Sequence, residues 1–99
     1  MIMKAIFIVY NQAYNQEIVE LLEDCGQRGY TVWEEVGGRG GETGEPHLGN
    51  HAWPTQNHAV FTVVDDDLAP RILELLRQTD RDNAKLGLRA YMLPVEDAL

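Results

Sequence analysis

The strongest structural signal is the apolar run Ile2-Met-Lys-Ala-Ile-Phe-Ile-Val-Tyr10 near the start of the chain. Its β-branched and aromatic residues favour a strand, and apolar side chains fall on both faces of that strand. Such a strand lies inside a sheet, with helices on one face and a neighbouring subunit available to cover the other. We therefore expect residues 2–10 to form a central strand. The run is shorter than the roughly 18 apolar residues that span a bilayer. It also lacks the long apolar region of a signal peptide, because the polar residues Asn11-Gln12 follow it directly.

Outward from this strand, the spacing of apolar residues predicts a helix and then a hairpin. The helix has about 13 residues and ends at Gly26 or Gly29. Its buried stripe consists of Tyr14, Ile18, Leu21, Leu22 and Cys25. Residues 30–36 and 57–64 then alternate β-branched or aromatic residues with others, which predicts a second and a third strand paired with each other.

A second helix and a fourth strand complete the pattern. Asp65-Asp-Asp67 offers capping oxygens and negative charge at a helix start, and Pro70 is tolerated in a first turn. The predicted buried stripe is Leu68, Ile72, Leu75 and Leu76. Residues 79–85 are expected to form a loop, and residues 86–93 a strand that ends at Pro94.

The resulting order is β, α, β, β, α, β, which predicts an α+β fold. It is the ferredoxin-like βαββαβ sandwich, in which two helices pack on one face of a four-stranded antiparallel sheet. We expect residues 1–99 to form a single domain, with the open sheet face covered by another copy of the chain.

Charge and cysteine content narrow the function classes. Eight Lys and Arg against sixteen Asp and Glu give a net charge of -8, which repels nucleic acid. Cys25 is the single cysteine, so no disulfide forms within the chain and a cytoplasmic protein is expected. Cys25 belongs to a buried stripe, and no nucleophile, base and orienting group are placed together, so we do not expect an enzyme.

The segment between the second and third strands, residues 37–56, is the main functional candidate. A hairpin needs about two to five loop residues, and this segment has about 20. Six of the nine glycines lie in it, so its backbone can approach a ligand closely and present N–H groups to an anion near Arg39. The alternative is a flexible surface loop without a ligand.

The loop also gathers metal-binding side-chain types. The three histidines of the chain, His47, His51 and His58, lie within a dozen residues. Together with Glu45, His47 and His51 make a candidate site for Zn, Ni or Cu(II). The alternative is that these histidines make ordinary hydrogen bonds, and for His58 a structural hydrogen bond at the end of the sheet is expected.

One apolar pair interrupts this polar loop. Trp53-Pro54 either anchors the loop on its own sheet or inserts into a partner protein.

The strand order, the stretch Val36-Gly-Gly-Arg-Gly40 and the long loop together resemble the P-II signalling proteins. This resemblance implies a homotrimer that binds small effectors, often adenine nucleotides, in clefts between subunits. It also implies a loop that docks on a membrane transporter, an enzyme or a regulatory protein. By position, Gly37, Gly38, Arg39 and Gly40 line the cleft. The docking portion is residues 41–56, with Glu42, Thr43 and Trp53 as contact residues.

Two local features set the chain apart from the P-II proteins it resembles. Their phosphate-binding stretch Thr-Gly-x-x-Gly-Asp-Gly-Lys-Ile is replaced by Thr79-Asp-Arg-Asp-Asn-Ala-Lys-Leu-Gly-Leu88, which leaves Lys85 and Arg89 as charges for an anion. The string Gly38-Arg-Gly-Gly-Glu-Thr-Gly-Glu-Pro-His47 resembles the P-II-like group associated with heavy-metal efflux systems.

Three functional hypotheses follow from these patterns. The first is a non-enzymatic trimeric sensor whose effector, an adenine nucleotide or a transition metal, changes loop docking. The second is a metal-binding protein of a heavy-metal resistance system that uses the loop histidines and glutamate. The third is an interaction module without a small-molecule ligand.

Overall fold

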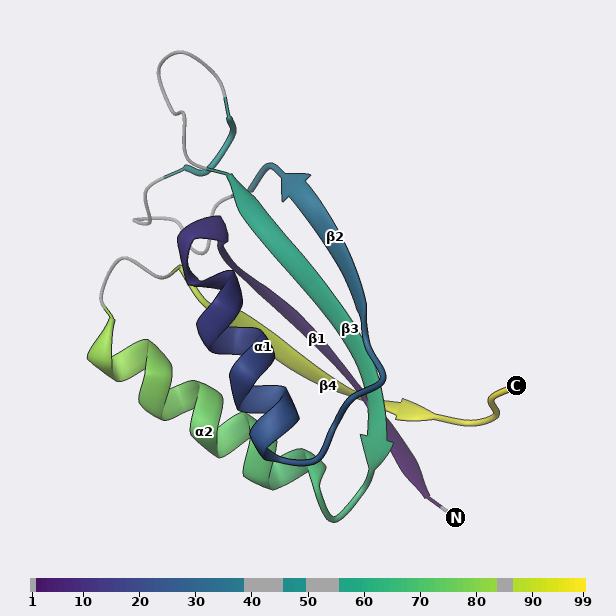
Figure 1. Cartoon of the computed structure of the whole chain (residues 1–99). Helices are drawn as coiled ribbons and strands as arrows, with labels where there is room; N and C mark the ends of the chain where they lie inside the picture. Colours follow the sequence, from purple (N-terminus) through teal and green to yellow (C-terminus); the bar gives the residue numbers. More distant parts are fainter. Residues whose placement is uncertain (1, 39–45, 50–55, 84–86) are drawn as a thin grey trace.

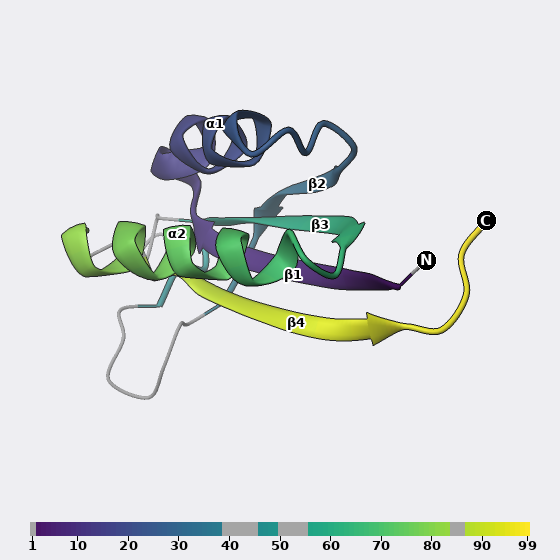
Figure 2. The same ribbon diagram turned by 90° about the horizontal axis from the view of Figure 1, so that it is seen from below.

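The computed structural model describes residues 2–38, 46–49, 56–83 and 87–99. Its strands form one antiparallel sheet in the order β2-β3-β1-β4. Both long helices cover the same face of this sheet (Figures 1 and 2). The predicted α+β, ferredoxin-like arrangement is therefore confirmed. The elements are β1 (Met3–Asn11), η1 (Gln12–Tyr14), α1 (Asn15–Asp24), β2 (Thr31–Val36), β3 (Asn57–Asp65), α2 (Ala69–Asp82) and β4 (Arg89–Val95).

Strand β1 is the central strand that the sequence predicts. It pairs with β3 on one side and with β4 on the other, so that Phe7 lies opposite both Phe61 and Tyr91. Successive side chains of a strand point to opposite faces. On the face of β1 that meets the helices, Ile6, Ile8 and Tyr10 are fully buried.

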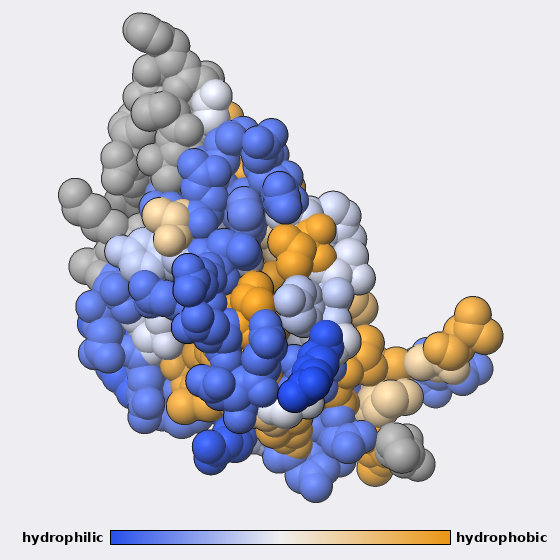
Figure 3. All heavy atoms as spheres, viewed as in Figure 1, coloured by the Kyte–Doolittle hydropathy of each residue, from blue (hydrophilic) through white to orange (hydrophobic). Residues whose placement is uncertain are grey.

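The core fills the space between the sheet and the helices. Helix α1 contributes Ile18 and Leu22, and α2 contributes Ile72 and Leu76. Burying a large aliphatic side chain stabilises the fold by about 1.5–3 kcal/mol. Figure 3 shows that the outer, helix-covered side of the molecule is mainly hydrophilic, as expected for amphipathic helices.

The opposite face of the sheet is apolar and open. Phe7 and Trp33 stack there with ring centroids 6.3 Å apart and an interplanar angle of 11°. Trp33 is 47% exposed and Tyr91 is 58% exposed. Phe61 and Leu93 add further exposed apolar area on the same side. This exposed apolar area is the surface that the sequence analysis expects another copy of the chain to cover.

The first helical region is divided into two parts, unlike the continuous helix of about 13 residues that the spacing predicts. A 3-10 turn, η1, precedes α1, which has 10 residues. The side chain of Asn11 accepts a hydrogen bond from the backbone N–H of Ala13. This local bond starts the tighter turn before the α-helix begins.

Helix α2 is longer than predicted and starts without an aspartate cap. Its N-cap is Leu68, with no side-chain capping bond, although Pro70 does lie in the first turn as predicted. The helix continues through Thr79 to Asp82, where a loop was expected. The hydroxyl of Thr79 donates to the carbonyl of Leu75, so this polar residue is satisfied inside the helix.

Strand β4 is also displaced from its predicted range. It covers residues 89–95 and contains Pro94, which was expected to end it. Because β4 lies at the edge of the sheet, the missing N–H of proline need not remove a ladder hydrogen bond. Within the described residues, no helix is long and apolar enough to cross a membrane.

Candidate functional site

The base of the loop consists of Gly37, Gly38, residues 46–49 and Gln56, and it continues the β2–β3 hairpin beyond its strands. The backbone N–H of Gly38 donates to the carbonyl of His47 at 2.9 Å, and the N–H of His47 donates to the carbonyl of Gly38 at 2.6 Å. A second bridge pairs Leu48 with Gln56. Residues 46–49 therefore link the end of β2 to the start of β3.

Glycine is required where this short segment turns. Gly49 has a φ of +69°, a conformation that side chains other than glycine rarely adopt. A Cβ at this position would lie 2.3 Å from the Nε2 atom of Gln56. The glycine therefore allows Gln56 to pack against the turn.

His47 lies at the centre of the loop base. Its side chain is only 4% exposed, and its Nδ1 lies 2.6 Å from the Oδ1 of Asn57, which is 2% exposed. An amide oxygen can only accept a hydrogen bond, so Nδ1 carries the proton. The imidazole also meets Gly87, where a Cβ would lie 2.9 Å from the ring carbon Cε1. His47 thus contacts the first residue of β3 and the segment that precedes β4.

This arrangement brings together part of the predicted effector site. Gly37 and Gly38 follow β2, and both lie against the segment that carries His47. Arg89 begins β4, is exposed, and donates to the carbonyl of Leu88 at 2.7 Å. The remaining predicted effector residues, Arg39, Gly40 and Lys85, lie outside the described residues.

The predicted metal and docking residues are described only in part. His47 is the one member of the metal set with a described position, because Glu45 and His51 lie outside the described residues. No group of three or more His, Cys, Asp or Glu that suits a metal occurs in the described part of the chain. The docking residues Glu42, Thr43 and Trp53 also lie outside it.

His58 and Tyr10 form an aromatic contact under α1. Their ring centroids are 6.1 Å apart at an angle of 61°. The Nδ1 of His58 is buried and has no hydrogen-bond partner among the described residues, so the structural hydrogen bond expected of His58 is not made by this atom. The Tyr10 hydroxyl donates to Oδ1 of Asn15. Burial, followed by the nearby Tyr30, raises the pKa of Tyr10 to about 12, which keeps it a hydrogen-bond donor at neutral pH.

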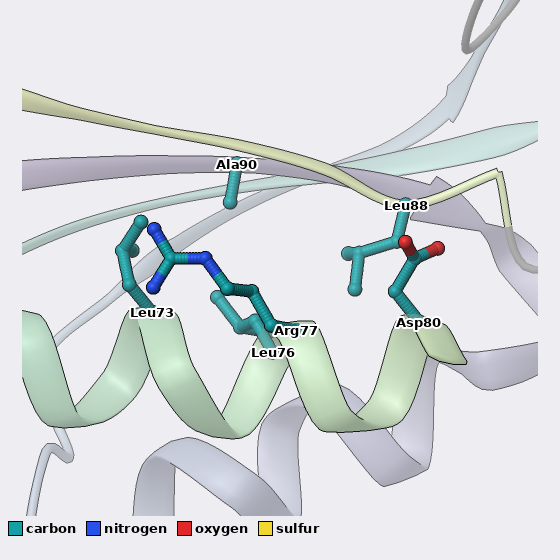
Figure 4. Close-up of a pocket in the computed structure, with 6 residues that line it drawn as sticks. All are labelled: Leu73, Leu76, Arg77, Asp80, Leu88 and Ala90. Carbon is teal, nitrogen blue, oxygen red and sulfur yellow. The ribbon is translucent and has the colours of Figure 1, made fainter. Parts of the chain in front are cut away.

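A small hollow lies between α2 and β4, next to the loop base. Figure 4 shows Arg77 and Asp80 reaching from α2 toward the strand. The hollow has a volume of about 130 Å³, and its apolar lining is Leu73, Leu76, Leu88 and Ala90. Ligand pockets usually measure about 300–1,000 Å³, so this hollow alone is too small for a nucleotide.

A larger groove separates α1 from α2 and has a volume of about 430 Å³. Glu17, Glu20 and Asp24 line it, with Arg71 as the single cation. Three carboxylates against one guanidinium disfavour an anionic ligand. Cys25 lines the same groove and is half-buried. This groove is therefore a poor candidate for a phosphate-bearing effector.

Sequence reasoning missed two residues that pack against the loop base, Asn57 and Gly87. Asn57 begins a strand, where an amide is usually exposed, and it is buried only because His47 returns to it. Gly87 lies between Leu86 and Leu88, just before β4, and an isolated glycine in such a strand-like stretch signals a close approach of backbone or ligand. That signal was available, but it does not identify His47 as the neighbour.

Comparison with known protein families identifies the family of this chain. The sequence model of the family described as "Nitrogen regulatory protein P-II" matches residues 3–99. The chain belongs to the P-II family. This match confirms the predicted resemblance. P-II proteins are regulatory proteins. No curated protein sequence matches this P-II protein at a significant level.

Solved structures of P-II-like proteins share the fold. A PII-like signalling protein from Thermus thermophilus is 25% identical, with a TM-score of 0.68, and the match covers 96% of this chain and 87% of that one. CPII from Thiomonas intermedia, a nitrogen regulatory PII-like protein solved with ADP, AMP and bicarbonate, is 18% identical. Its TM-score is 0.74, and the match covers 98% of this chain and 91% of that chain. The apo form of CPII matches with a TM-score of 0.68 at 16% identity, over 96% of this chain and 92% of that one.

Proposed function

We propose that this P-II protein is a non-enzymatic, cytoplasmic sensor that binds an adenine nucleotide at the base of its loop. The observation that carries this proposal is the meeting of Gly37 and Gly38 with Gly87 around the buried His47. Two glycine-bearing backbone segments from distant parts of the chain lie at one end of the sheet. Backbone without side chains allows a ligand to approach closely.

The charges near this backbone suit a phosphate. Arg39 directly follows Gly38, while Lys85 and Arg89 flank Gly87 in the sequence. Arginine binds phosphate through two parallel hydrogen bonds, and lysine binds it as a point charge. These three cations stand out in a chain with a net charge of -8. We assign them to the phosphates of the nucleotide.

The related structures support the class of ligand. CPII was solved with ADP and bicarbonate, with ADP, AMP and bicarbonate, and with ADP, AMP and acetate. We extend the nucleotide class to this chain, with a small carboxylate-like anion as a second ligand. The typical P-II phosphate stretch is replaced by residues 79–88, so the loop base has to supply more of the phosphate contacts.

The open sheet face supports a homotrimer. Trp33, Phe61 and Tyr91 remain exposed on that face in a single chain, and covering them removes apolar area from water. The hollow beside the loop base is also too small for a nucleotide. We infer that neighbouring subunits cover the sheet and complete the effector site between them.

The loop, residues 37–56, is the proposed contact with a partner. Nucleotide bound at the loop base would bias the loop toward one arrangement and so change its affinity for that partner. Glu42, Thr43 and Trp53 are the proposed contact residues, and the partner is a membrane transporter or another regulatory protein.

A thermal-shift comparison of variants tests the nucleotide site. ADP is expected to raise the melting temperature of the wild type, because a ligand that binds only the folded state stabilises it. Arg39→Ala should lose this shift. Arg71→Ala removes the same charge from the α1–α2 groove, away from the loop base, and should keep it. Equal shifts in both variants, or no shift in the wild type with ADP, ATP or AMP, would contradict the proposal.

The metal hypothesis for Glu45, His47 and His51 can be tested in the same experiment. A stabilising shift with Zn, Cu or Ni salts that disappears in His47→Ala/His51→Ala would support a metal-binding protein instead. A nucleotide shift without any metal shift would leave the sensor as the function.

A further inference from the structure

We propose that His47 is the positioning residue of the effector site. It holds the segment that follows β2, at Gly38, and the segment that precedes β4, at Gly87, at a fixed spacing. The inference rests on the proposed function for the identity of the ligand, whereas the contacts of His47 are independent of it. It assigns to His47 a role in the protein interior, where the sequence alone left a metal ligand and an ordinary hydrogen bond as alternatives.

The backbone of His47 is fixed on the side of β2. Both its backbone N–H and its backbone carbonyl bond to Gly38, at 2.6 and 2.9 Å. A residue bonded reciprocally to one partner has little freedom to rotate about its backbone. The backbone of His47 is therefore held beside Gly38, two residues beyond the end of β2.

The imidazole of His47 is fixed on the side of β3. Its Nδ1 donates to the amide oxygen of Asn57 over 2.6 Å, and both side chains are buried. A buried polar group left without a partner is destabilising. Asn57 thus requires a donor at this point, and His47 supplies it.

The same ring limits how closely the segment before β4 can pack against His47. Gly87 has a φ of +63°, and a Cβ there would lie 2.9 Å from Cε1 of His47. Only a glycine can pack so closely against the ring. The flat imidazole therefore defines the separation between Gly38 and Gly87.

This separation matters for a ligand because both segments lead into candidate contacts. Gly38 and Gly87 both offer backbone without a side chain, and Gly87 leads to Leu88, which lines the hollow between α2 and β4. Without the hydrogen bond to Asn57, the side chain at position 47 is no longer held in place between the two segments, and their distance changes without the loss of a charge. The expected consequence is weaker binding of a nucleotide by a protein that remains folded and keeps its oligomeric state.

A matched pair of amides at position 47 provides the test. In His47→Asn the side-chain N–H₂ lies near the original place of Nδ1, whereas in His47→Gln it lies one bond further out, nearer Nε2. The measurement is calorimetric titration of each full-length variant with ADP, with light scattering to check the oligomer. Both variants lose the ring, but only His47→Asn keeps the donor to Asn57. We therefore expect His47→Gln to raise the Kd for ADP about tenfold and His47→Asn to raise it clearly less.

Equal loss in both amide variants would overturn the positioning role, because a residue needed only to fill space gains nothing from the placement of its donor. Retention of full affinity in His47→Gln would overturn it as well. A zinc titration belongs to the same series, and stoichiometric zinc binding by the wild type that is absent from His47→Asn would assign His47 to a metal instead.

A double-mutant cycle tests the contacts without any ligand. Gly87→Ala introduces a methyl group at the 2.9 Å contact, and His47→Ala removes the ring that it meets. The backbone strain at Gly87 is common to both backgrounds, so coupling between the two changes reports the steric contact. We expect Gly87→Ala to lower the urea midpoint less in His47→Ala than in the wild type. Additive effects would overturn the contact, and if ADP does not bind the wild type, this cycle still decides the role of His47.

Discussion

Glu35 is the one non-glycine residue with a positive φ, +56°, in the described part of the chain. The pairing of β2 with β3 is irregular between Trp33 and Val36, which lie opposite Ala59 and Asn57. Two residues of β2, Glu34 and Glu35, therefore oppose the single residue His58. This is a β-bulge, and it lies directly before the loop base, where bulges commonly redirect a strand.

The bulge predicts an unusual gain of stability on substitution. A left-handed backbone costs a residue with a Cβ about 1–2 kcal/mol, a cost that glycine avoids. Glu35→Gly should therefore keep or raise the free energy of unfolding by up to about 1 kcal/mol, after the greater entropy of glycine in the unfolded chain is included. Urea denaturation measures the change. Glu34→Gly is the matched control and should lower stability, and the reverse order would rule out the bulge geometry.

Tyr10 predicts a pH dependence at the alkaline end. Its pKa of about 12 in the folded protein lies above the value of about 10 for an unfolded chain. The stabilisation from neutral Tyr10 is thus complete below about pH 10 and is lost as the pH rises toward 12. Two pKa units correspond to about 3 kcal/mol. Urea titrations across this range should show a steeper loss for the wild type than for Tyr10→Phe, and parallel losses would contradict the assignment.

At the level of single residues, sequence reasoning identified candidates and could not assign their environments. His47 was recognised as a histidine of interest, but its burial depends on Asn57 and Gly87, which are 10 and 40 positions away. A metal ligand and a buried hydrogen-bonded histidine have the same one-letter code. Only the approach of distant segments distinguishes them.

At the level of elements, the period of α2 predicts Ile72 and Leu76 at the helix–sheet interface correctly, but it also predicts Leu75 there, which is wrong. Leu76 is buried against the sheet, whereas its neighbour Leu75 lines the α1–α2 groove. The two leucines present the same side chain to different environments. Leu76→Ala should lower the free energy of unfolding by about 2–5 kcal/mol, and Leu75→Ala should cost clearly less. Chemical denaturation gives both values, and equal losses would show that α2 packs with another face.

Element identities could be predicted from the sequence because the apolar pattern is clear, as in the continuous apolar run of residues 2–10 and the helical period along α2. Element ends were less predictable because local bonds decide them. Thr79 extends α2 by bonding back to Leu75, and Pro94 is accepted because β4 happens to lie at the sheet edge. Neither fact is encoded within a window of a few residues.

At the level of the whole molecule, the open sheet face should control assembly. Replacing Phe61 by lysine places a charge in the centre of the exposed apolar face. Burial of that charge between subunits is costly, so Phe61→Lys should be a monomer where the wild type has three times the 11.2 kDa mass of one chain. Light scattering measures this difference. Gln78→Lys, on the exposed side of α2, should leave the mass unchanged, and a trimeric Phe61→Lys would place the interface elsewhere.

The order of elements allowed the fold and the family to be predicted, and the match to the P-II family over residues 3–99 confirms both. The position of the effector is less accessible to sequence reasoning. In the proposed trimer it lies where Gly37, Gly38 and Gly87 of one chain meet a second chain. A pattern within one chain contains no information about which residues of the next one it faces.

The most direct test is to follow the backbone amides of isotopically labelled protein by NMR while ADP is added. The proposed site predicts that the amide signals of Gly37, Gly38 and Gly87 shift together and saturate, with those of the α1–α2 groove, such as Leu21 and Leu75, unchanged. Absence of any saturable shift, or shifts confined to the α1–α2 groove, would contradict a nucleotide site at the loop base.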